Sequence, residues 1–417
     1  MRGVKLFAHA LCLLPCAVWS ADYRATAADY REILRHLKPG DRLLLAAGDY
    51  RHGLPLHRLA GTASKPITIE AADPLTPPRF VAQPRSNTVS LVDVRHLVLR
   101  DLELDGANIP VDALKAEGHS RFADFITIER LHIHDYAASQ QNVAISTKCP
   151  AFGWVIRDTV ITHVGTGMYL GDSDGGDPFV AGLIEGNHVS QTRGYTLQIK
   201  HQISRALGNI ARHDTVIRHN VFSKRGSAPG PEARPNLLLG HFPLSGPGAA
   251  DRYLVYGNLF LDNASEALVQ AEGRMAFYDN VLINAAGDAL HIQPHNDVPR
   301  EMDIFSNTVL ASGTGIRIRR GDGLRYRQRV FANLVAAASP LEGGEASGNL
   351  TLNYDPRWLT ARIDKLAPRM LAAKPTPPGL AKHETRRLAG YPDWTRRTHP
   401  GARIGPALLD AMRRGRP

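Results

Sequence analysis

The sequence has little of what marks the common enzyme classes. It contains 3 cysteines in 417 residues, and neither a Gly-x-x-x-x-Gly-Lys-Ser/Thr phosphate loop nor a His-Glu-x-x-His sequence. Nucleotide hydrolysis at such a loop and zinc proteolysis of that type are therefore without support. Aromatic residues make up only 7% of the chain and form no interleaved platform, so nucleic acid is not an expected partner.

Long apolar runs are also lacking, since spanning a bilayer takes about 20 residues. The apolar run at residues 6–19 is shorter; Arg2 and Lys5 precede it, and the small residues Val18 and Ser20 mark a cleavage position. This anatomy is typical of a signal peptide, here residues 1–20. We therefore expect a periplasmic or secreted protein, monomeric, with no integral membrane segment after cleavage.

Cysteine is too scarce to hold the mature protein together. Cys12 and Cys16 leave with the signal peptide, and only Cys149 remains. An internal disulfide and a cysteine-based zinc site are therefore excluded, and the 43% of hydrophobic residues must supply a core. Lysine and arginine exceed acidic residues by 50 to 40, a formal charge of +10, which favours an anionic partner.

The sequence does contain a repeat of the form apolar-x-x-Asn-x-apolar. It occurs around Asn187 and Asn220, and further copies centre on Asn258, Asn280, Asn307 and Asn333, at spacings of 33, 38, 22, 27 and 26 residues. Self-similarity at such periods indicates a solenoid. Short alternating apolar stretches bounded by Gly, Asn or Asp fill each unit, as expected for strands. A β-propeller would show even blades of about 40–45 residues with a Trp-Asp signature, which this chain lacks.

These patterns predict an all-β fold, a single right-handed parallel β-helix over residues 21–353 with its asparagines stacked in one turn. Residues 27–37, with Thr26 as N-cap, predict a capping helix at the N-terminal end. Residues 354–417 are expected to form an irregular, basic extension. It contains Pro375, Pro377, Pro378, Arg386, Arg387, Arg396 and Arg397.

One face of the predicted β-helix carries an unusual set of polar side chains. Aligning the second alternating run of each unit puts Tyr169, Gln198, Gln270, His291 and Arg317 in one outward column, and Gly171, Lys200, Gly240, Glu272, Gln293 and Arg319 in the next. Outward side chains of successive coils stack about 4.8 Å apart, which makes a groove suited to a linear chain. With the nearby His295, the Tyr, Gln, Glu, His and Arg residues of these columns are the predicted substrate-binding residues.

An acidic turn lies beside this face. Residues 171–177 read Gly-Asp-Ser-Asp-Gly-Gly-Asp, so Asp172, Asp174 and Asp177 offer carboxylates at alternating positions. Such oxygen ligands suit Ca²⁺, the one cofactor that the sequence suggests, although Asp-Gly turns are also common without a metal.

Residues 43–50 and 61–69, Leu-Leu-Leu-Ala-Ala-Gly-Asp-Tyr and Gly-Thr-Ala-Ser-Lys-Pro-Ile-Thr-Ile, resemble the opening of chondroitinase B and alginate lyase β-helices. This resemblance implies a lyase that cleaves uronic-acid chains, with a Lys base and an Arg nearby. Residues 197–200 resemble the strand that carries that lysine, here Lys200. Where the family ends the next strand in Arg-His, this chain has Gly240 and His241. The family's calcium-binding carboxylates fall at Arg193 and Tyr195.

The leading hypothesis is therefore an exported lyase for an acidic polysaccharide. Lys200 would remove the proton, His241 would act as acid or orienting group, and Arg225 would replace the missing arginine, with Arg234 and Arg317 as alternatives. A glycoside hydrolase needs two carboxylates at a defined separation, for which Asp172, Asp174, Asp177 and Glu272 are the candidates. A non-catalytic polysaccharide-binding or export protein on the same scaffold is the third hypothesis.

Overall fold

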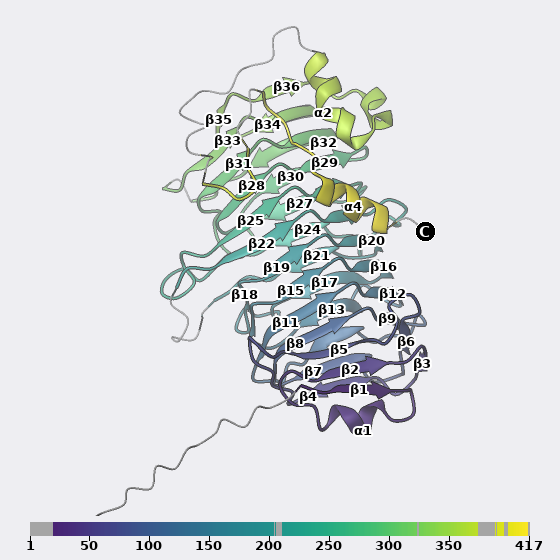
Figure 1. Ribbon diagram of the computed structural model, residues 1–417. Helices are drawn as coiled ribbons and strands as arrows, with labels where there is room; N and C mark the ends of the chain where they lie inside the picture. Colours follow the sequence, from purple (N-terminus) through teal and green to yellow (C-terminus); the bar gives the residue numbers. More distant parts are fainter. Residues whose placement is uncertain are drawn as a thin grey trace, which may run out of the picture.

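A computed structural model describes residues 20–203, 205, 211–322, 325–373, 388, 390–395 and 399–415. The predicted signal peptide, apart from Ser20, and the marked prolines and arginines of the extension lie outside these residues. The chain winds upward in Figure 1 as a stack of coils, from β1 (Asp22–Ala25) to β36 (Leu350–Leu352).

Within the described residues, every strand pairing between successive coils is parallel, and the strands form two hydrogen-bonded sheets of 15 and 21 strands. The smaller sheet is the first ladder. Its path runs through β1, β2 (Arg42–Leu45), β5 (Ile67–Ala71), β8 (Val94–Arg100), β11 (Ala123–Glu129), β15 (Val155–Arg157), β19 (Leu183–Glu185), β22 (Asp214–Arg218), β25 (Arg252–Tyr256), β28 (Met275–Tyr278), β31 (Met302–Phe305), β33 (Gln328–Phe331) and β35 (Glu345–Ser347), with β14 (Ala151–Phe152) and β18 (Phe179–Val180) beside it.

The larger sheet consists of two ladders on different sides of the coil. The second ladder contains β3 (Gly48–Tyr50), β6 (Pro78–Val81), β9 (Glu103–Asp105), β12 (His132–Tyr136), β16 (Val160–Val164), β20 (His188–Thr192), β23 (Val221–Ser223), β26 (Leu259–Leu261), β29 (Val281–Asn284) and β36. The third ladder contains β4 (Leu54–His57), β7 (Val89–Val92), β10 (Leu114–Ala116), β13 (Val143–Thr147), β17 (Thr166–Leu170), β21 (Leu197–Ile199), β24 (Leu237–Leu239), β27 (Val269–Ala271) and β30 (Leu290–Ile292). They join where the long strands β32 (Thr308–Ile318) and β34 (Leu334–Glu342) run through both. The predicted parallel β-helix is thus confirmed.

The core lies inside the coil and is built from stacked apolar side chains. In the first ladder, one inward column runs in register through Leu43, Ile69, Leu99, Ile128, Ile156, Ile184, Ile217, Val255, Phe277, Ile304 and Val330. Each of these side chains is buried. Because each coil buries its apolar face mainly against the next coil, the stack is stable only as a continuous unit.

The repeated asparagines form the predicted ladder at the turn between the first and second ladders. The amide of Asn220 donates to Oδ1 of Asn258 at 2.9 Å, and Asn258 donates in the same way to Asn280 at 3.0 Å. The series continues in both directions and reaches from Asn187 through Asn307 and Asn333 to Asn349. Each side chain also accepts a backbone N–H from the previous asparagine, so the turn closes on itself from coil to coil.

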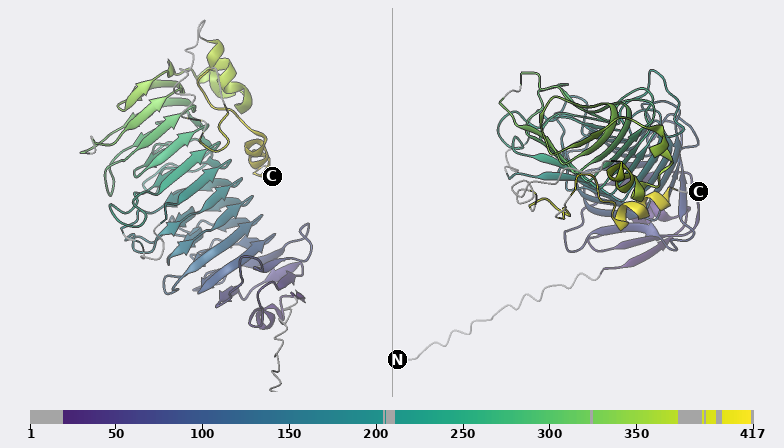
Figure 2. Two further views of the ribbon diagram at one scale, coloured as in Figure 1. Left: turned by 60° about the vertical axis from the view of Figure 1, so that its left-hand side comes forward. Right: turned by 90° about the horizontal axis from the view of Figure 1, so that it is seen from above.

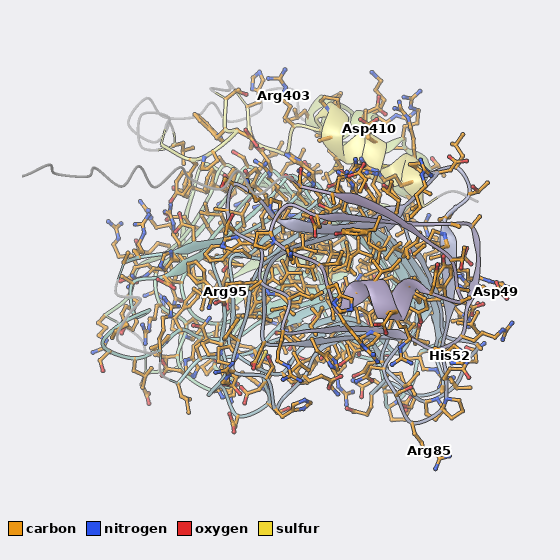
Figure 3. The ribbon with its side chains drawn as sticks, turned by 60° about the horizontal axis from the view of Figure 1, so that its bottom comes forward. Asp49, His52, Arg85, Arg95, Arg403 and Asp410 are labelled. Carbon is orange, nitrogen blue, oxygen red and sulfur yellow. The ribbon has the colours of Figure 1, made fainter. Side chains whose placement is uncertain are left out.

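The two ends of the stack are covered differently. At the N-terminal end, α1 (Tyr30–Leu34) lies across the first coil, as Figure 3 shows from that end. This helix is shorter than predicted: it begins after Asp29, whose carboxylate accepts the backbone N–H of Thr26 at 2.7 Å, and it ends at Leu34. Tyr30 and Leu34 bury its inner face.

The C-terminal extension contains η1 (Pro356–Thr360), α2 (Ile363–Ala372) and α4 (Pro406–Arg414). It folds back over the outside of the second ladder, and α4 lies alongside the middle coils in Figure 2. Leu366, Met370, Leu408 and Ala411 are buried there against side chains of the second ladder. No helix among the described residues has the length and apolarity to cross a membrane.

The asparagine ladder predicts a position-dependent loss of stability. Asn258→Ala should leave the Asn220 amide groups without their buried acceptor, at a cost of about 1–3 kcal/mol for each unpaired group. Asn349→Ala, at the half-buried end of the ladder, should cost clearly less. Denaturant unfolding of both variants measures this difference, and equal losses would contradict the account.

Candidate functional site

The structure places the two predicted columns on the outer side of the third ladder. In the first column, Tyr169 pairs with Gln198, and Gln270 pairs with His291, which pairs with Arg317. Leu238 lies between Gln198 and Gln270 in this column, and the column predicted from the sequence did not include it. Backbone hydrogen bonds just beyond the strand ends give the second column the same order: Lys200, Gly240, Glu272, Gln293 and Arg319.

A pocket of about 240 Å³ opens at Lys200. Three predicted residues line it: Lys200, Tyr169 and Gln198. Arg234 and Tyr195 complete its polar wall, together with Gln140, Gln141, Val143 and Thr166. The polar side chains come from β17, from β21 and the residue after it, and from the loops before β13, β21 and β24. Register between coils therefore fixes their separation.

The Lys200 amine is half-buried, and no hydrogen bond or ion pair to it occurs among the described residues. Burial lowers the pKa of Lys200 below its ordinary value of 10.5, while the charges of Asp172 and Glu272 oppose that change. Desolvation is thus the principal cause of the lowered pKa of Lys200. A lysine in this state supplies a neutral amine at lower pH than an exposed one does.

A second lysine lies in the same column two coils earlier. The Lys148 amine sits 3.4 Å from the centre of the Tyr169 ring, and the Lys200 amine sits 5.9 Å from it. Gly171 occupies the coil between the two lysines and leaves space there, because it has no side chain. Burial, reinforced by Lys115 and Lys200, lowers the pKa of Lys148 to about 8.

Two tyrosines and an arginine complete the cluster. Burial raises the pKa of Tyr169 and of Tyr195, so both phenols stay protonated near neutral pH and can donate. The Tyr169 hydroxyl is 3.0 Å from Ser173 Oγ. Arg234 is half-buried, its Nη1 donating to the carbonyls of Pro231 and Ala233, and it lies close enough to Tyr195 to interact with its phenol.

Buried polar atoms beside the pocket have unused hydrogen-bonding capacity. Gln198 Oε1 and Ser146 Oγ are both buried and have no partner among the described residues. Both side chains stand in the column of Tyr169, one coil on either side of it. A polar ligand that enters the groove would satisfy such atoms.

The structure does not bring Arg225 to this cluster. Its guanidinium is exposed and pairs with Asp262 at 2.8 Å beyond β23, beside the second ladder. Of the three arginines considered for this role, Arg234 alone lines the Lys200 pocket among the described residues. Arg317 is further along the third ladder and is held by Glu342 at 2.6 Å.

His241 is buried, one coil after Lys200. Its Nδ1 faces the Phe242 carbonyl at 2.8 Å, and its ring centre is 5.4 Å from that of His201. The remaining column residues lie further along the third ladder, away from the pocket. Gln270 donates to Glu266, His291 is 2.9 Å from Asp288, Gln293 is half-buried, and His295 and Arg319 are exposed.

Glu272 is not available to a substrate, contrary to the prediction. It is 1% exposed, and its carboxylate accepts the backbone N–H groups of His295, Asn296 and Asp297 at 2.8–3.0 Å. Its other oxygen accepts the N–H of His241 at 3.2 Å. Glu272 therefore anchors two loops beside the third ladder, because a buried carboxylate needs several donors.

The acidic turn is organised by its own backbone. Asp172 Oδ1 accepts the N–H groups of Gly175 and Asp177 at 3.0 Å, and Asp174 accepts that of Gly176 at 2.8 Å. In the described part of the chain, the acidic turn does not bring three potential ligand atoms within 4.8 Å of one another; one other group of side chains does. Calcium binding here stays a prediction.

Residues 171–175 also have the sequence Gly-x-Ser-x-Gly, which is the motif of a nucleophile elbow. No helix follows these residues, as a nucleophile elbow requires.

Sequence reasoning missed Lys148 and Tyr195. Lys148 could have been predicted, because residues 143–147 alternate in the same way as the later strands. Extending the column of Lys200 back by two coils leads to Lys148. Tyr195 has no such signal, because it lies in a loop whose path depends on contacts with the next coil.

Comparisons with known proteins agree on the fold. The sequence matches no known family profile, and no curated protein is significantly similar to it. The GH136 lacto-N-biosidase from Eubacterium ramulus superposes with a TM-score of 0.56 at 13% identity, over 80% of this chain and 68% of the other. An alginate lyase from Paenibacillus sp. str. FPU-7 gives 0.45 at 16% identity, over 80% and 98%. A mannuronic-acid-specific family 6 polysaccharide lyase from human gut microbiota gives 0.45 at 14% identity, over 94% and 98%. The chain is thus a parallel β-helix protein of the architecture seen in the lacto-N-biosidase.

The position of Glu272 predicts a loss of stability on substitution. Four backbone N–H groups donate to the Glu272 carboxylate, and Glu272→Gln removes its charge and one of its two acceptor oxygens. The unfolding free energy should therefore fall, since hydrogen bonds to charged groups contribute about 1.5–3 kcal/mol. Gln293→Ala, one coil further in the same column, should change the unfolding free energy little. Denaturant unfolding compares them. A Glu272→Gln variant as stable as the parent would show that the loops do not depend on this carboxylate.

Proposed function

We propose that this protein is a lyase that cleaves an acidic, uronic-acid-containing polysaccharide by β-elimination. The observation that carries the proposal is the half-buried amine of Lys200, which shares one groove-side pocket with Arg234, Tyr169 and Tyr195. The groove on the third ladder suits a linear chain, and the clustered cations suit an anionic one. The predicted signal peptide supports export, where such polymers are found.

The chemistry requires a base, a cation and an acid. The base removes the proton on the carbon next to the uronate carboxyl group, whose acidity is weak until the carboxylate is neutralised. The electron pair of the broken C–H bond then forms a carbon–carbon double bond within the sugar ring. The bond to the glycosidic oxygen on the neighbouring carbon breaks, and that oxygen takes a proton from the acid.

The residues of the pocket fit these three tasks. Neutral Lys200 accepts the proton, and its lowered pKa makes the neutral form accessible. The Arg234 guanidinium pairs with the uronate carboxylate. Tyr169 keeps its proton, because burial raises its pKa, and donates it to the leaving oxygen. Lys148, stacked on the Tyr169 ring, adds positive charge beside the chain.

The hydrolase alternative is less well supported. It requires two carboxyl groups on either side of a bond, and no acidic residue lines the Lys200 pocket among the described residues. Glu272 is fully engaged with backbone donors, and the nearby Asp172 is used by its own turn. The lacto-N-biosidase shares the fold, but a shared fold does not fix the chemistry. A binding protein without activity remains the third hypothesis.

Substitution of the base tests the mechanism. Lys200→Met keeps the side-chain length but removes the amine, so turnover on a uronic-acid polymer should fall by about 10²–10⁴-fold, the range for a lost acid–base group. The exposed Lys38→Met serves as the control and should keep full activity. The reaction is measured by the ultraviolet absorbance of the unsaturated product. Full turnover by Lys200→Met would refute the base assignment.

Two of the three arginines considered for this role, Arg234 and Arg225, offer a matched comparison. Arg234→Gln should reduce kcat/KM by at least tenfold, since the carboxylate loses its partner in the ground state and in the transition state. Arg225→Gln should leave kcat/KM unchanged, because Arg225 pairs with Asp262 away from the pocket. The opposite pattern would move the site to the second ladder.

The lowered lysine pKa values predict a pH profile. Turnover should rise with pH as Lys200 loses its proton, and this rise should occur below the ordinary lysine value of 10.5. KM should increase as the pH rises through about 8, where Lys148 loses its charge. In Lys148→Met the KM increase near this pH should disappear. A KM increase at the same pH in the variant would exclude Lys148 as its source.

A further inference from the structure

A cluster of imidazole and carboxylate groups lies on the second ladder, on a different side of the coil from Lys200. It contains Asp105 from β9, His134 and Asp135 from β12, and His163 from β16, on three successive coils. Asp105 pairs in register with His134. Their outward side chains are therefore neighbours, about one strand spacing apart.

A backbone irregularity adds the other members of the cluster. Asp135 and His163 have positive φ values of 59° and 54°, and Gln191 repeats this conformation in the next coil with 53°. In a regular strand Asp135 would point away from His134. The left-handed residue instead lets consecutive side chains meet, and His134 Nδ1 is 2.8 Å from Asp135 Oδ2. The irregularity belongs to the repeat, while the residues that occupy it are particular to these two coils.

The potential ligand atoms converge. One atom each from Asp105, His134 and Asp135 all lie within 4.8 Å of one another, and among the described residues no other three His, Cys, Asp or Glu side chains do so. The three side chains are half-buried. His163 Nδ1 contacts the second Asp135 oxygen at 2.5 Å, so this imidazole fixes the carboxylate from the other side.

The surroundings of His134 resemble those of a metal-binding histidine. Its Nε2 faces Glu103 Oε1 at 3.1 Å, which leaves Nδ1 directed at the two aspartates. Histidine ligands of metals are commonly held by such a carboxylate on the other ring nitrogen. Asp105 Oδ1 accepts the N–H of Ala107 at 2.9 Å, and Asp105 Oδ2 lies 3.6 Å from Arg79. The main partner of Arg79 is Asp49, at 2.8 Å, so Asp105 Oδ2 is the oxygen left for a metal ion.

We propose that Asp105, His134 and Asp135 bind one divalent transition-metal ion, with zinc the best match. Imidazole and carboxylate ligands suit zinc and its neighbours in the first transition series, whereas calcium prefers six or more oxygens. The ion takes the place between His134 Nδ1 and Asp135, and solvent completes its coordination. Glu103 and His163 orient the ligands. Because the ligands come from β9 and β12, the ion ties two coils together.

This site is independent of the proposed lyase activity. The ligands belong to the second ladder and the Lys200 pocket to the third, so the metal would act on stability. An ion that binds the folded chain alone raises the unfolding free energy and therefore Tm. The alternative is a plain ion-pair network, in which a proton bridges His134 and Asp135 and no metal binds.

Calorimetry on untagged, chelator-treated protein tests the proposal, with Zn²⁺ as the probe and Ca²⁺ as the comparison ion. We expect one Zn²⁺ per chain, no comparable binding of Ca²⁺, and a higher Tm with Zn²⁺. Co²⁺ should give visible absorption bands of a protein-bound ion. Absence of Zn²⁺ binding, or equal binding of Ca²⁺, would overturn the proposal.

Variants separate the site from other surface groups. His134→Asn and Asp135→Asn should abolish the one-to-one binding, and Glu103→Gln should raise the Zn²⁺ Kd by about 10–100-fold, as for a lost carboxylate that orients a ligand. The exposed His52→Asn, near Asp49 at the N-terminal end (Figure 3), should bind as the parent does. Circular dichroism of the metal-free variants verifies their fold. Unchanged binding by both His134→Asn and Asp135→Asn would locate the ion elsewhere and contradict the proposal.

Discussion

The hydrogen bond from one coil to the next is the interaction on which the rest of this structure depends. Parallel strands pair only with the coils above and below, and the buried asparagine ladder repeats the same connection at the turn between the first and second ladders. Each coil is thereby held in register with its neighbours. A register error of one residue would exchange the inward and outward faces of a strand, so the apolar columns and the asparagines fix together which side chains reach the groove.

The candidate site is a consequence of that register. Lys148, Tyr169 and Lys200 are separated by more than twenty residues at each step, yet they meet on three successive coils. The two lysines occupy equivalent positions two coils apart, and Tyr169 stands in the neighbouring column on the coil between them. Burial by the surrounding loops then lowers the pKa of both amines, since removing a cation from water disfavours its charged form. Fold, position and reactivity are thus connected through one repeated geometry, and the same geometry places a different set of ionisable groups on the second ladder.

The sequence predicts the repeat well, because the same residue type, an asparagine that donates and accepts hydrogen bonds, is needed at the same position of each coil. It predicts the outward columns and therefore Tyr169, Gln198 and Lys200. It does not predict what engages each outward residue: Glu272 is taken by loop backbone, and Arg225 by Asp262. These partners lie in turns of irregular length, as do Arg234 and Tyr195, and loop paths follow from tertiary contacts. The capping helix is predicted at the right place but is shorter than expected, Tyr30–Leu34 instead of residues 27–37.

The central claim is that the pocket at Lys200 breaks a glycosidic bond by elimination and not by adding water. The mass of the products distinguishes the two most directly. A uronic-acid polymer cleaved in water enriched in heavy oxygen should yield fragments whose new non-reducing end is lighter by one water than a hydrolysis product and carries an unsaturated sugar. No heavy oxygen should enter by the cleavage itself. Saturated fragments that contain one heavy oxygen per cleavage would identify a hydrolase and contradict the account.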